Sequence, residues 1–221
     1  MATPDGVTLT NCAEEYGRRA IKIGLERRRV QDLQDAMNHA EFKERHHQLL
    51  DQLVREHRHN LQLIERPPFA TIEVGTYKTI ADLCQALTGS YFPITSGASY
   101  LMLRPKFTLL AEPAKLDLHM VSNTQLGHPN GCTVKESFTA LKNIGAVKLP
   151  PEAGPQYRLQ YADQPFGESR YMYMDPIVSL HGNREVFCVK RDDSDRWLDS
   201  RFAHPNFFLS SDVIWVYARN K

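Results

Sequence analysis

The sequence predicts an α+β protein in which a long N-terminal helical arm precedes a body of antiparallel hairpins and two short helices. The arm is expected because no proline lies between Pro4 and Pro67 and no glycine lies between Gly24 and Gly75, so this stretch lacks both helix breakers. Beyond Pro67 the chain changes to short alternating runs divided by turn residues, which is typical of strands and hairpins. Two runs in this second part begin instead with a helix cap.

The arm is assigned to residues 1–66 and is expected to be the oligomerisation segment. Its clearest part, residues 25–65, exceeds the ~25 residues beyond which a periodic pattern indicates a coiled coil or a helical hairpin. A heptad pattern runs through it, and the polar residues Lys43, His47 and His57 would fix the register of its seam. A lone helix of this kind is marginal in water, so we expect it to pair, either with its own chain or with another copy. The apolar residues expected at this seam are Leu33, Leu50, Val54, Leu61 and Ile64.

The body is assigned to residues 67–221, and two helices are expected there from their caps. Thr79 precedes the first and Thr133 the second, and each is followed three residues later by an acidic residue. These helices are expected over residues 80–88 and 134–144. Strands are expected over residues 91–95 with 100–104, 157–162 with 170–174, and 177–180 with 185–190 as hairpins, and over 213–218 as an interior strand that is apolar on both faces.

The charge balance excludes a general electrostatic attraction to polyanions. Lysine and arginine number 27 against 26 aspartate and glutamate residues, which gives a formal charge of +1. The N-terminus lacks a basic region followed by an apolar run, and no stretch approaches the ~18 consecutive apolar residues of a membrane-spanning helix. We therefore expect a non-secreted, cytoplasmic protein without a membrane partner.

Cysteine spacing and nucleotide motifs give no sign of catalysis. Cys12, Cys84, Cys132 and Cys188 show no paired spacing, so we expect reduced thiols and no metal site. No GxGxxG, Walker-type or GxSxG motif is present, so no cofactor and no catalytic residue is assigned. Cys132 lies at the start of a predicted helix, where a thiol pKa falls, and a nucleophile paired with a histidine is one interpretation. A small buried residue beside a helix cap is the other.

Basic and aromatic residues give the clearest indication of a ligand. Arg18, Lys22 and Arg29 share one face of the expected arm and suit the phosphates of a nucleic acid, although they also suit a solvated helix face. In the hairpin expected over residues 157–162 and 170–174, tyrosines lie beside arginines, an arrangement on which single-stranded nucleic acid stacks. Aromatic pairs across strands are equally typical of a sheet core. The candidate binding residues in this hairpin are Tyr157, Arg158, Tyr161, Arg170, Tyr171 and Tyr173.

Three functions of different classes follow from these observations. The first is a non-enzymatic, oligomeric accessory protein whose arm assembles it and whose body binds a macromolecule, with single-stranded nucleic acid the first partner to test. The second is a structural or assembly protein that binds other protein subunits. The third is a hydrolase that uses histidine and aspartate residues of the body. No motif in the sequence decides among them.

Overall fold

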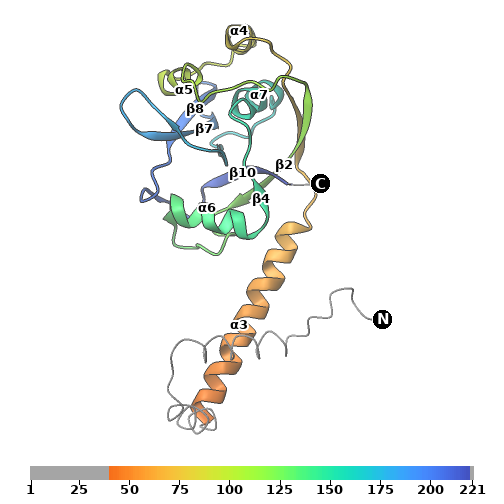
Figure 1. The fold of residues 1–221 in the computed structure, drawn as a ribbon, viewed down its shortest axis with the longest axis vertical. Coiled ribbons are helices and arrows are strands. Elements are labelled where there is room, and N and C mark those ends of the chain that lie inside the picture. Colours follow the sequence, from red (N-terminus) through yellow and green to blue (C-terminus); the bar gives the residue numbers. More distant parts are fainter. Residues whose placement is uncertain (1–39, 220–221) are drawn as a thin grey trace. The chain divides into compact units, whose positions relative to one another are not determined.

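The structure is a computed structural model that describes residues 40–219, without the side chains of residues 40–42 and 56–58. The chain divides into two compact units, residues 1–59 and residues 60–221. Helix α3 (Ala40–Ile64) begins in the first unit and ends in the second, and every other described helix and strand belongs to the second (Figure 1).

The second unit is built on an eight-stranded sheet with the strand order β1-β2-β10-β5-β7-β6, in which β4 pairs with β10 and β8 pairs with β7. Strands β10 and β5 run parallel, whereas the other pairings in this sheet are antiparallel. The strands of this sheet are β1 (Ala70–Val74), β2 (Ala114–Ser122), β4 (Ala146–Val147), β5 (Ser169–Met172), β6 (Ile177–Val178), β7 (Arg184–Arg191), β8 (Arg196–Phe202) and β10 (Ile214–Arg219). A separate antiparallel pair joins β3 (Cys132–Thr133) to β9 (Phe208–Leu209).

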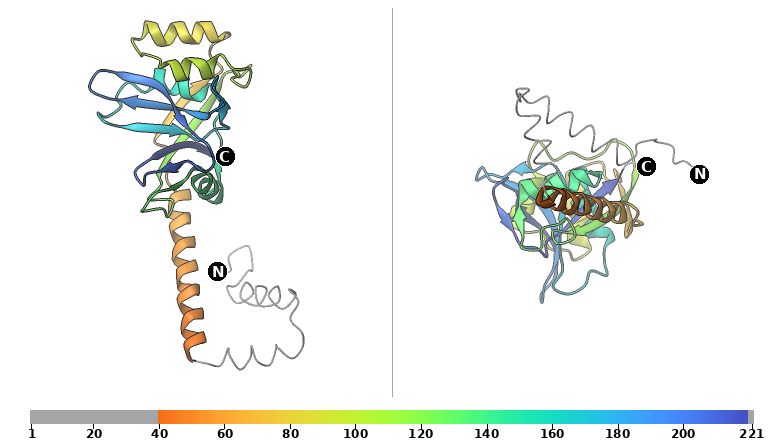
Figure 2. Two further views of the ribbon diagram at one scale, coloured as in Figure 1. Left: turned by 90° about the vertical axis from the view of Figure 1, so that its left-hand side faces the viewer. Right: turned by 90° about the horizontal axis from the view of Figure 1, so that it is seen from below.

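Helices pack against both faces of the large sheet. Helix α7 contacts β1, β7 and β8, α4 contacts α7, and α5 contacts β8. On the opposite face, Phe138 of α6 meets Trp215 of β10 edge to face, with ring centroids 5.3 Å apart. These helices are α4 (Ile80–Gly89), α5 (Ser96–Met102), α6 (Val134–Asn143) and α7 (Ala153–Gln160), and Figures 1 and 2 show their arrangement around the strands.

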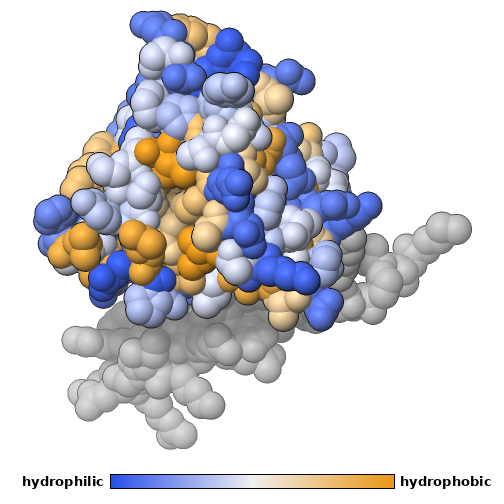
Figure 3. Space-filling view, turned by 90° about the horizontal axis from the view of Figure 1, so that it is seen from above, coloured by the Kyte–Doolittle hydropathy of each residue, from blue (hydrophilic) through white to orange (hydrophobic). Residues whose placement is uncertain are grey.

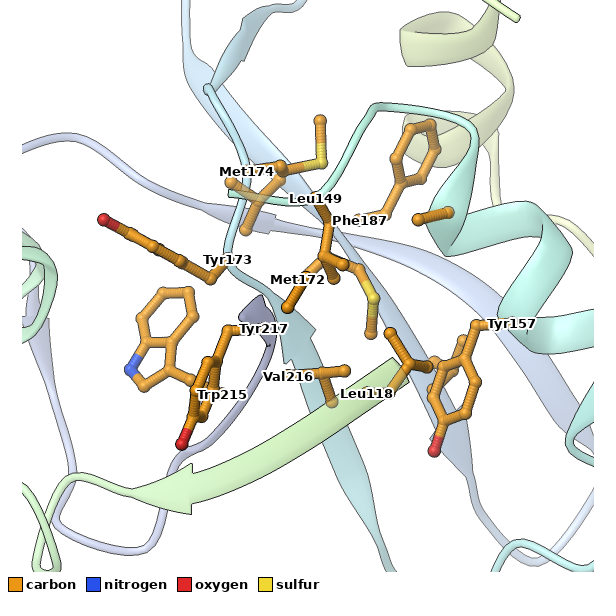
Figure 4. Packing of buried hydrophobic residues seen from close by; sticks show 14 of the residues in the cluster. Leu118, Leu149, Tyr157, Met172, Tyr173, Met174, Phe187, Trp215, Val216 and Tyr217 are labelled. Carbon is orange, nitrogen blue, oxygen red and sulfur yellow. The ribbon is translucent and has the colours of Figure 1, made fainter. Parts of the chain in front are cut away.

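The hydrophobic core occupies both faces of the central strands. Along β10, Trp215 and Tyr217 point to the face where α6 packs, and Val216 between them points to the other face (Figure 4). There it packs beside Met172 and Leu118, and all of these side chains are buried. The expectation that residues 213–218 form an interior strand is therefore confirmed, because β10 lies between β2 and β5 and is apolar on both sides.

The fold class expected from the sequence, a long helical arm followed by an α+β body of hairpins, is wrong. The structure is a mixed α/β fold in which helices cover both faces of one large sheet, and it describes five helices. The described part of the expected arm is a 25-residue helix that begins at Ala40. Residues 1–39 lie outside the described residues, so a helical arm over residues 1–66 is not supported. The absence of proline and glycine permits a helix but does not specify one, because helix propensity is weak without tertiary packing.

Local capping signals located two of the helices correctly. The side chains of Thr79 and Thr133 accept hydrogen bonds from the backbone amides of Asp82 and Glu136, and Thr133 forms a complete capping box. The expected hairpin of β6 and β7 is also confirmed, since these strands pair antiparallel. Caps depend on residues three apart in the sequence, which is why the sequence alone could find them.

Two expected hairpins are wrong because helices replace a strand in each. Thr95, read as the end of a strand, caps α5 by accepting a hydrogen bond from the amide of Ala98 at 3.3 Å. Residues 157–160, also read as a strand, form the second half of α7. Tyr157 and Tyr161 are four residues apart, a spacing that shares one face in a helix and in a strand alike. The tyrosine pattern therefore could not distinguish the two structures.

Helix α7 lies so close to β7 that its second residue must be small. A Cβ atom added at Gly154 would lie 2.6 Å from the Cβ atom of Phe187. Glu152, the residue immediately before α7, is fully buried and accepts hydrogen bonds from the backbone amides of Gly75 (3.0 Å) and Leu110 (2.5 Å). Close packing and these bonds fix the start of α7 over the sheet.

Two glutamines continue this attachment along α7, one turn apart. Gln160 bonds both backbone groups of Glu73 on the edge strand β1: the Glu73 amide donates to Oε1 and Nε2 donates to the Glu73 carbonyl, each at 2.8 Å. A neighbouring strand would use the same two groups, so the glutamine closes the sheet edge at this position. Gln156 donates from Nε2 to the hydroxyl of Thr76 at 2.8 Å.

The last turn of α3, which belongs to the second unit, is attached to the sheet through Arg219. The guanidinium group of this β10 residue donates to the carbonyl oxygens of Leu63, Ile64 and Arg66. Carbonyls at a helix C-terminus lack partners within the helix, and a cation there also complements the helix dipole. Leu63 is buried at 1 % exposure, so this turn of α3 is part of the core.

We expect Gly154→Ala to lower the free energy of unfolding by about 1–3 kcal/mol, because the added methyl group overpacks against Phe187. Gly89→Ala at the end of α4 is the matched control, since a Cβ atom there has no neighbour within 4 Å. That control should raise the free energy of unfolding by about 0.4–1 kcal/mol, because alanine reduces the conformational entropy of the unfolded chain. Urea unfolding of both variants measures the difference, and equal effects at the two sites would contradict the close approach of α7 to β7.

Candidate functional site: arginines and tyrosines around helix α7

The residues expected to contact phosphates, Arg18, Lys22 and Arg29, lie outside the described residues, as does Leu33 of the expected seam. The other candidate residues are all described. Four of them, Tyr157, Arg158, Tyr161 and Arg170, come together between α7 and β5, whereas Tyr171 and Tyr173 lie apart from this group. We call those four side chains, together with Gln164 and Glu168, the arginine–tyrosine cluster.

Tyr157 and Tyr161 stack on each other along one face of α7. Their ring centroids are 5.0 Å apart and the ring planes differ by 10°. The four-residue spacing that suggested a strand face produces this stack on a helix. Tyr157 is buried at 1 % exposure, and Tyr161 is half-buried. Neither face of the Tyr157 ring is therefore open to a nucleic acid base.

Arg170 of β5 lies against these rings from the sheet. Its guanidinium carbon is 4.5 Å from the ring centroid of Tyr161 and 4.8 Å from that of Phe69, which are cation–π distances. One η nitrogen donates to the hydroxyl of Tyr157 at 2.5 Å, and the other donates to the carboxylate of Glu168 at 2.7 Å. This residue is 5 % exposed, so the pair with Glu168 is a largely buried ion pair.

Arg158 is fully buried, at 0 % exposure, and has no carboxylate partner among the described residues. It donates instead to neutral oxygens, the side-chain oxygen of Gln164 and the backbone carbonyl of Tyr161. Its guanidinium carbon lies 4.8 Å from the ring centroid of Phe92. A second ring, that of Tyr161, lies 6.0 Å away. A buried cation in contact with amide oxygens and rings, without a carboxylate, keeps an excess of positive charge in the interior.

Burial governs the ionisation of these groups. Removal from water raises the pKa of the Tyr157 hydroxyl above its ordinary value, and the nearby Arg170 offsets only part of that shift. Removal from water lowers the pKa of Arg158 to about 10. At neutral pH Tyr157 therefore stays neutral and Arg158 stays charged. The cluster thus carries positive charge, and neither of these two groups changes its protonation near neutral pH.

Tyr171 and Tyr173 belong to the opposite side of the strand layer. Tyr171 meets Trp215 edge to face with centroids 5.6 Å apart, and Tyr173 meets Phe138 in the same way at 5.0 Å. Figure 4 shows Tyr173 near Trp215 and Tyr157 well apart from them, beside α7. The tyrosines of the expected hairpin are thus divided between two faces of the sheet, and the rings of Tyr157 and Tyr173 are buried in its core.

Sequence reasoning missed two residues that complete the cluster, Gln164 and Glu168. Gln164, buried at 0 % exposure, donates from Nε2 to the carbonyls of Glu168 (3.0 Å) and Val189 (3.2 Å). Its own backbone carbonyl accepts from Arg191 at 2.6 Å. Nothing in the sequence distinguishes this glutamine from a turn residue. Only the meeting of α7, β5 and β7 gives it a role.

The seam residues of α3 that are described differ in their exposure. Leu50 and Val54 are half-buried, whereas Leu61 is 42 % and Ile64 is 40 % exposed. The most exposed apolar side chains on this helix are Leu49 at 62 % and Leu53 at 53 %, which the heptad pattern did not select. At 100° per residue, Leu49, Leu50, Leu53 and Val54 fall on one side of the helix. We call these four side chains the α3 leucine face.

The described cysteines lack the lowered pKa of an activated thiol nucleophile. Cys84, Cys132 and Cys188 are free thiols, and burial raises the pKa of each. The Sγ atom of Cys132 lies 3.1 Å from the hydroxyl of Ser137. A raised pKa leaves a thiol protonated, which opposes the proposed nucleophile. Among the side chains that the structure describes, no group of three from His, Cys, Asp or Glu could hold a metal ion.

No helix in the described part of the chain is long and apolar enough to span a membrane.

Tyr157→Phe tests whether this ring serves the core or a ligand. The change keeps the ring but leaves the buried Arg170 without one acceptor, so we expect the free energy of unfolding to fall by about 1–3 kcal/mol. Tyr161→Phe is the control, because it removes only a bond of 3.2 Å to the partly exposed Glu168 and should cost less. Urea unfolding and titration with a labelled oligonucleotide measure both variants. Unchanged stability with weaker oligonucleotide binding would show that the hydroxyl faces a ligand.

Comparison of the chain with protein-family models, with curated proteins and with solved structures finds no match.

Proposed function

We propose that the protein is a non-enzymatic assembly protein that associates with a second copy of itself through the α3 leucine face. The exposure of Leu49 and Leu53, at 62 % and 53 %, is the observation that supports this proposal. Leucine side chains arranged on one side of a helix stabilise it only when another apolar surface covers them. A second α3 helix offers an apolar surface of the same chemistry, as in two-stranded coiled coils.

Electrostatics permits such self-association. The formal charge of +1 means that two copies repel each other weakly. The opposite side of α3 carries charges of both signs, with Glu44, Asp51 and Arg55 all exposed. A helix with one apolar side and one mixed charged side suits a pair of helices in water rather than burial within a single core.

The second unit offers a less continuous apolar surface on the face that carries α4. Figure 3 shows its hydrophobic side chains in small groups separated by hydrophilic ones. Single exposed apolar side chains are ordinary on soluble proteins and need no partner. This contrast supports α3 rather than that face of the body as the assembly surface.

Single-stranded nucleic acid is the second partner that we propose, and its support comes from the sequence. Arg18, Lys22 and Arg29 are spaced to share one side of a helix, and the near-neutral net charge means that such a local group would have to supply the attraction. The rings of Tyr157 and Tyr173 are buried, so stacking on them does not support this proposal. Binding would therefore be electrostatic and modest in affinity.

Leu49→Asp with Leu53→Asp should dissociate the assembly, because two charges would have to be buried at the interface. Light scattering measures the mass in solution. The control is Gln48→Asp with Arg55→Asp, which places the same two residues on the opposite side of α3 and should leave the mass unchanged. A monomeric wild-type protein, or a double leucine variant that is folded by circular dichroism and keeps the wild-type mass, would contradict self-association through α3.

Replacing Arg18, Lys22 and Arg29 together by glutamine should weaken binding to a labelled single-stranded oligonucleotide. Removing each interaction with a phosphate should reduce the slope of log affinity against log salt by about 0.7, so the slope should fall by about 2. Fluorescence anisotropy over a salt series measures it. An unchanged slope would remove these residues from the interface, and no binding by the wild type at about 50 mM salt would leave protein assembly as the sole proposed function.

A further inference from the structure

Four arginines gather on the α7 face of the sheet. In the β7–β8 hairpin, Arg191 is directly opposite Arg196. Two residues further along each strand, Val189 is opposite Leu198. Val189 is in turn opposite Arg170 of β5. Residues directly opposite each other, and residues two apart along a strand, share one face of a sheet. Arg170, Arg191 and Arg196 therefore share a face, and it is the face that α7 covers with Arg158.

Gln164 joins two of these arginines. Its side-chain oxygen accepts from Arg158, and its backbone carbonyl accepts from an η nitrogen of Arg191 at 2.6 Å. The backbones of Arg191 and Glu168 also bond, with the Arg191 amide donating to the Glu168 carbonyl at 2.9 Å. A buried hydrogen bond therefore positions Arg158, and a partly buried one positions Arg191.

The positive charges of this group exceed its negative charges. Glu168 is paired with Arg170. Among the side chains that the structure describes, no carboxylate forms an ion pair with Arg158, Arg191 or Arg196.

The aspartates of the adjacent β7–β8 turn are used elsewhere or are open to solvent. Asp192 accepts from Lys190 at 2.7 Å and from the indole nitrogen of Trp197 at 3.0 Å. Lys190 and Trp197 are opposite each other, one position along the strands from Arg191 and Arg196. Neighbouring residues of a strand point to opposite faces, so Lys190 and Trp197 belong to the other face of the hairpin. Asp193 and Asp195 are exposed.

This arrangement is costly without an anion. Burial, with a further contribution from the charges of Arg196 and Arg170, lowers the pKa of Arg158 to about 10, so it remains charged at neutral pH. Like charges held together in a low-dielectric interior destabilise the fold. The Nε atoms of Arg158 and Arg196 are buried and have no hydrogen-bond partner in the described part of the chain. A group of unpaired charges lowers the stability of a fold. Such groups are therefore typical of binding sites, where a ligand supplies the opposite charge.

We propose that Arg191 and Arg196 bind a phosphate group, with the buried charge of Arg158 behind them. Both residues are half-buried and so reach solvent, whereas Arg158 does not. Among the described residues, hydrogen bonds engage one η nitrogen of Arg191 and none of Arg196, which leaves donors for a ligand. The planar guanidinium fork matches two oxygens of a phosphate. This site is independent of the α3 leucine face, and its ligand is either a small phosphorylated molecule or the backbone of a nucleic acid strand.

The test is calorimetric titration of the full-length protein with inorganic pyrophosphate, at an ionic strength held constant with sodium chloride. We expect the wild type to bind and Arg196→Gln to bind at least about tenfold more weakly, equivalent to about 1.4 kcal/mol. Arg184→Gln is the matched control: it removes an equal charge from an exposed position at the far end of β7 and should bind as the wild type does. No binding by the wild type, or equal losses in the two variants, would overturn the proposal.

Thermal unfolding separates a ligand site from a structural role. In chloride alone, Arg196→Gln should unfold at a higher temperature than the wild type, because it removes a like charge from beside Arg158. Addition of pyrophosphate should raise the melting temperature of the wild type by more than that of the variant. A lower melting temperature of the variant in both buffers would show that Arg196 is structural. If that variant does not fold, Arg196→Lys keeps the charge, loses the fork, and should still weaken pyrophosphate binding severalfold.

A second titration, with a single-stranded oligonucleotide, identifies the source of the phosphate. Binding of both pyrophosphate and the oligonucleotide, each weakened by Arg196→Gln, supports recognition of a nucleic acid backbone. If Arg196→Gln weakens the binding of pyrophosphate but not that of the oligonucleotide, the ligand is a small phosphorylated molecule. Oligonucleotide binding that is unaffected by this variant, together with no pyrophosphate binding, overturns the site.

Discussion

The close packing of α7 on the sheet is the constraint on which the rest of the second unit depends. At Gly154 the helix approaches β7 so closely that a Cβ atom would lie 2.6 Å from Phe187. Such an approach brings the next turns of α7 over the middle strands, where Tyr157 and Arg158 are buried. It also brings Gln160 to both backbone groups of Glu73 on the edge strand β1, which the glutamine satisfies in place of another strand. Glu152 accepts hydrogen bonds from the amides of Gly75 and Leu110, which lie outside the strands. One helix thus covers a face and closes an edge of the same sheet.

The same packing determines what the two buried arginines of this core contact. A helix held close to the sheet leaves little room for water, so the guanidinium groups of Arg158 and Arg170 contact aromatic rings and amide oxygens instead. Arg170 gains a carboxylate, Glu168, but Arg158 does not. The excess of positive charge is therefore a property of the fold, and it gives the neighbouring Arg191 and Arg196 an electrostatic setting that favours an anion.

The two features that suggest function are chemically unlike each other. The α3 leucine face is exposed and apolar, which suits association with another helix. The arginine pair at the β7–β8 hairpin is half-buried and positively charged, which suits a phosphate. A protein that carries both can assemble through one and bind a ligand through the other, and the two activities can be separated by substitutions that do not share a residue.

The sequence by itself determined the features that depend on residues close together in the chain. Thr79 and Thr133 marked two helices, and β7 and β10 followed from their apolar runs, because capping and alternation act over a few residues. Tertiary structure alone decided whether Tyr157 and Tyr161 lie on a strand or a helix, since a spacing of four residues suits both. It also decided that the tyrosines are buried and that Arg191 and Arg196 join Arg158, because burial and charge depend on segments brought together from distant parts of the sequence.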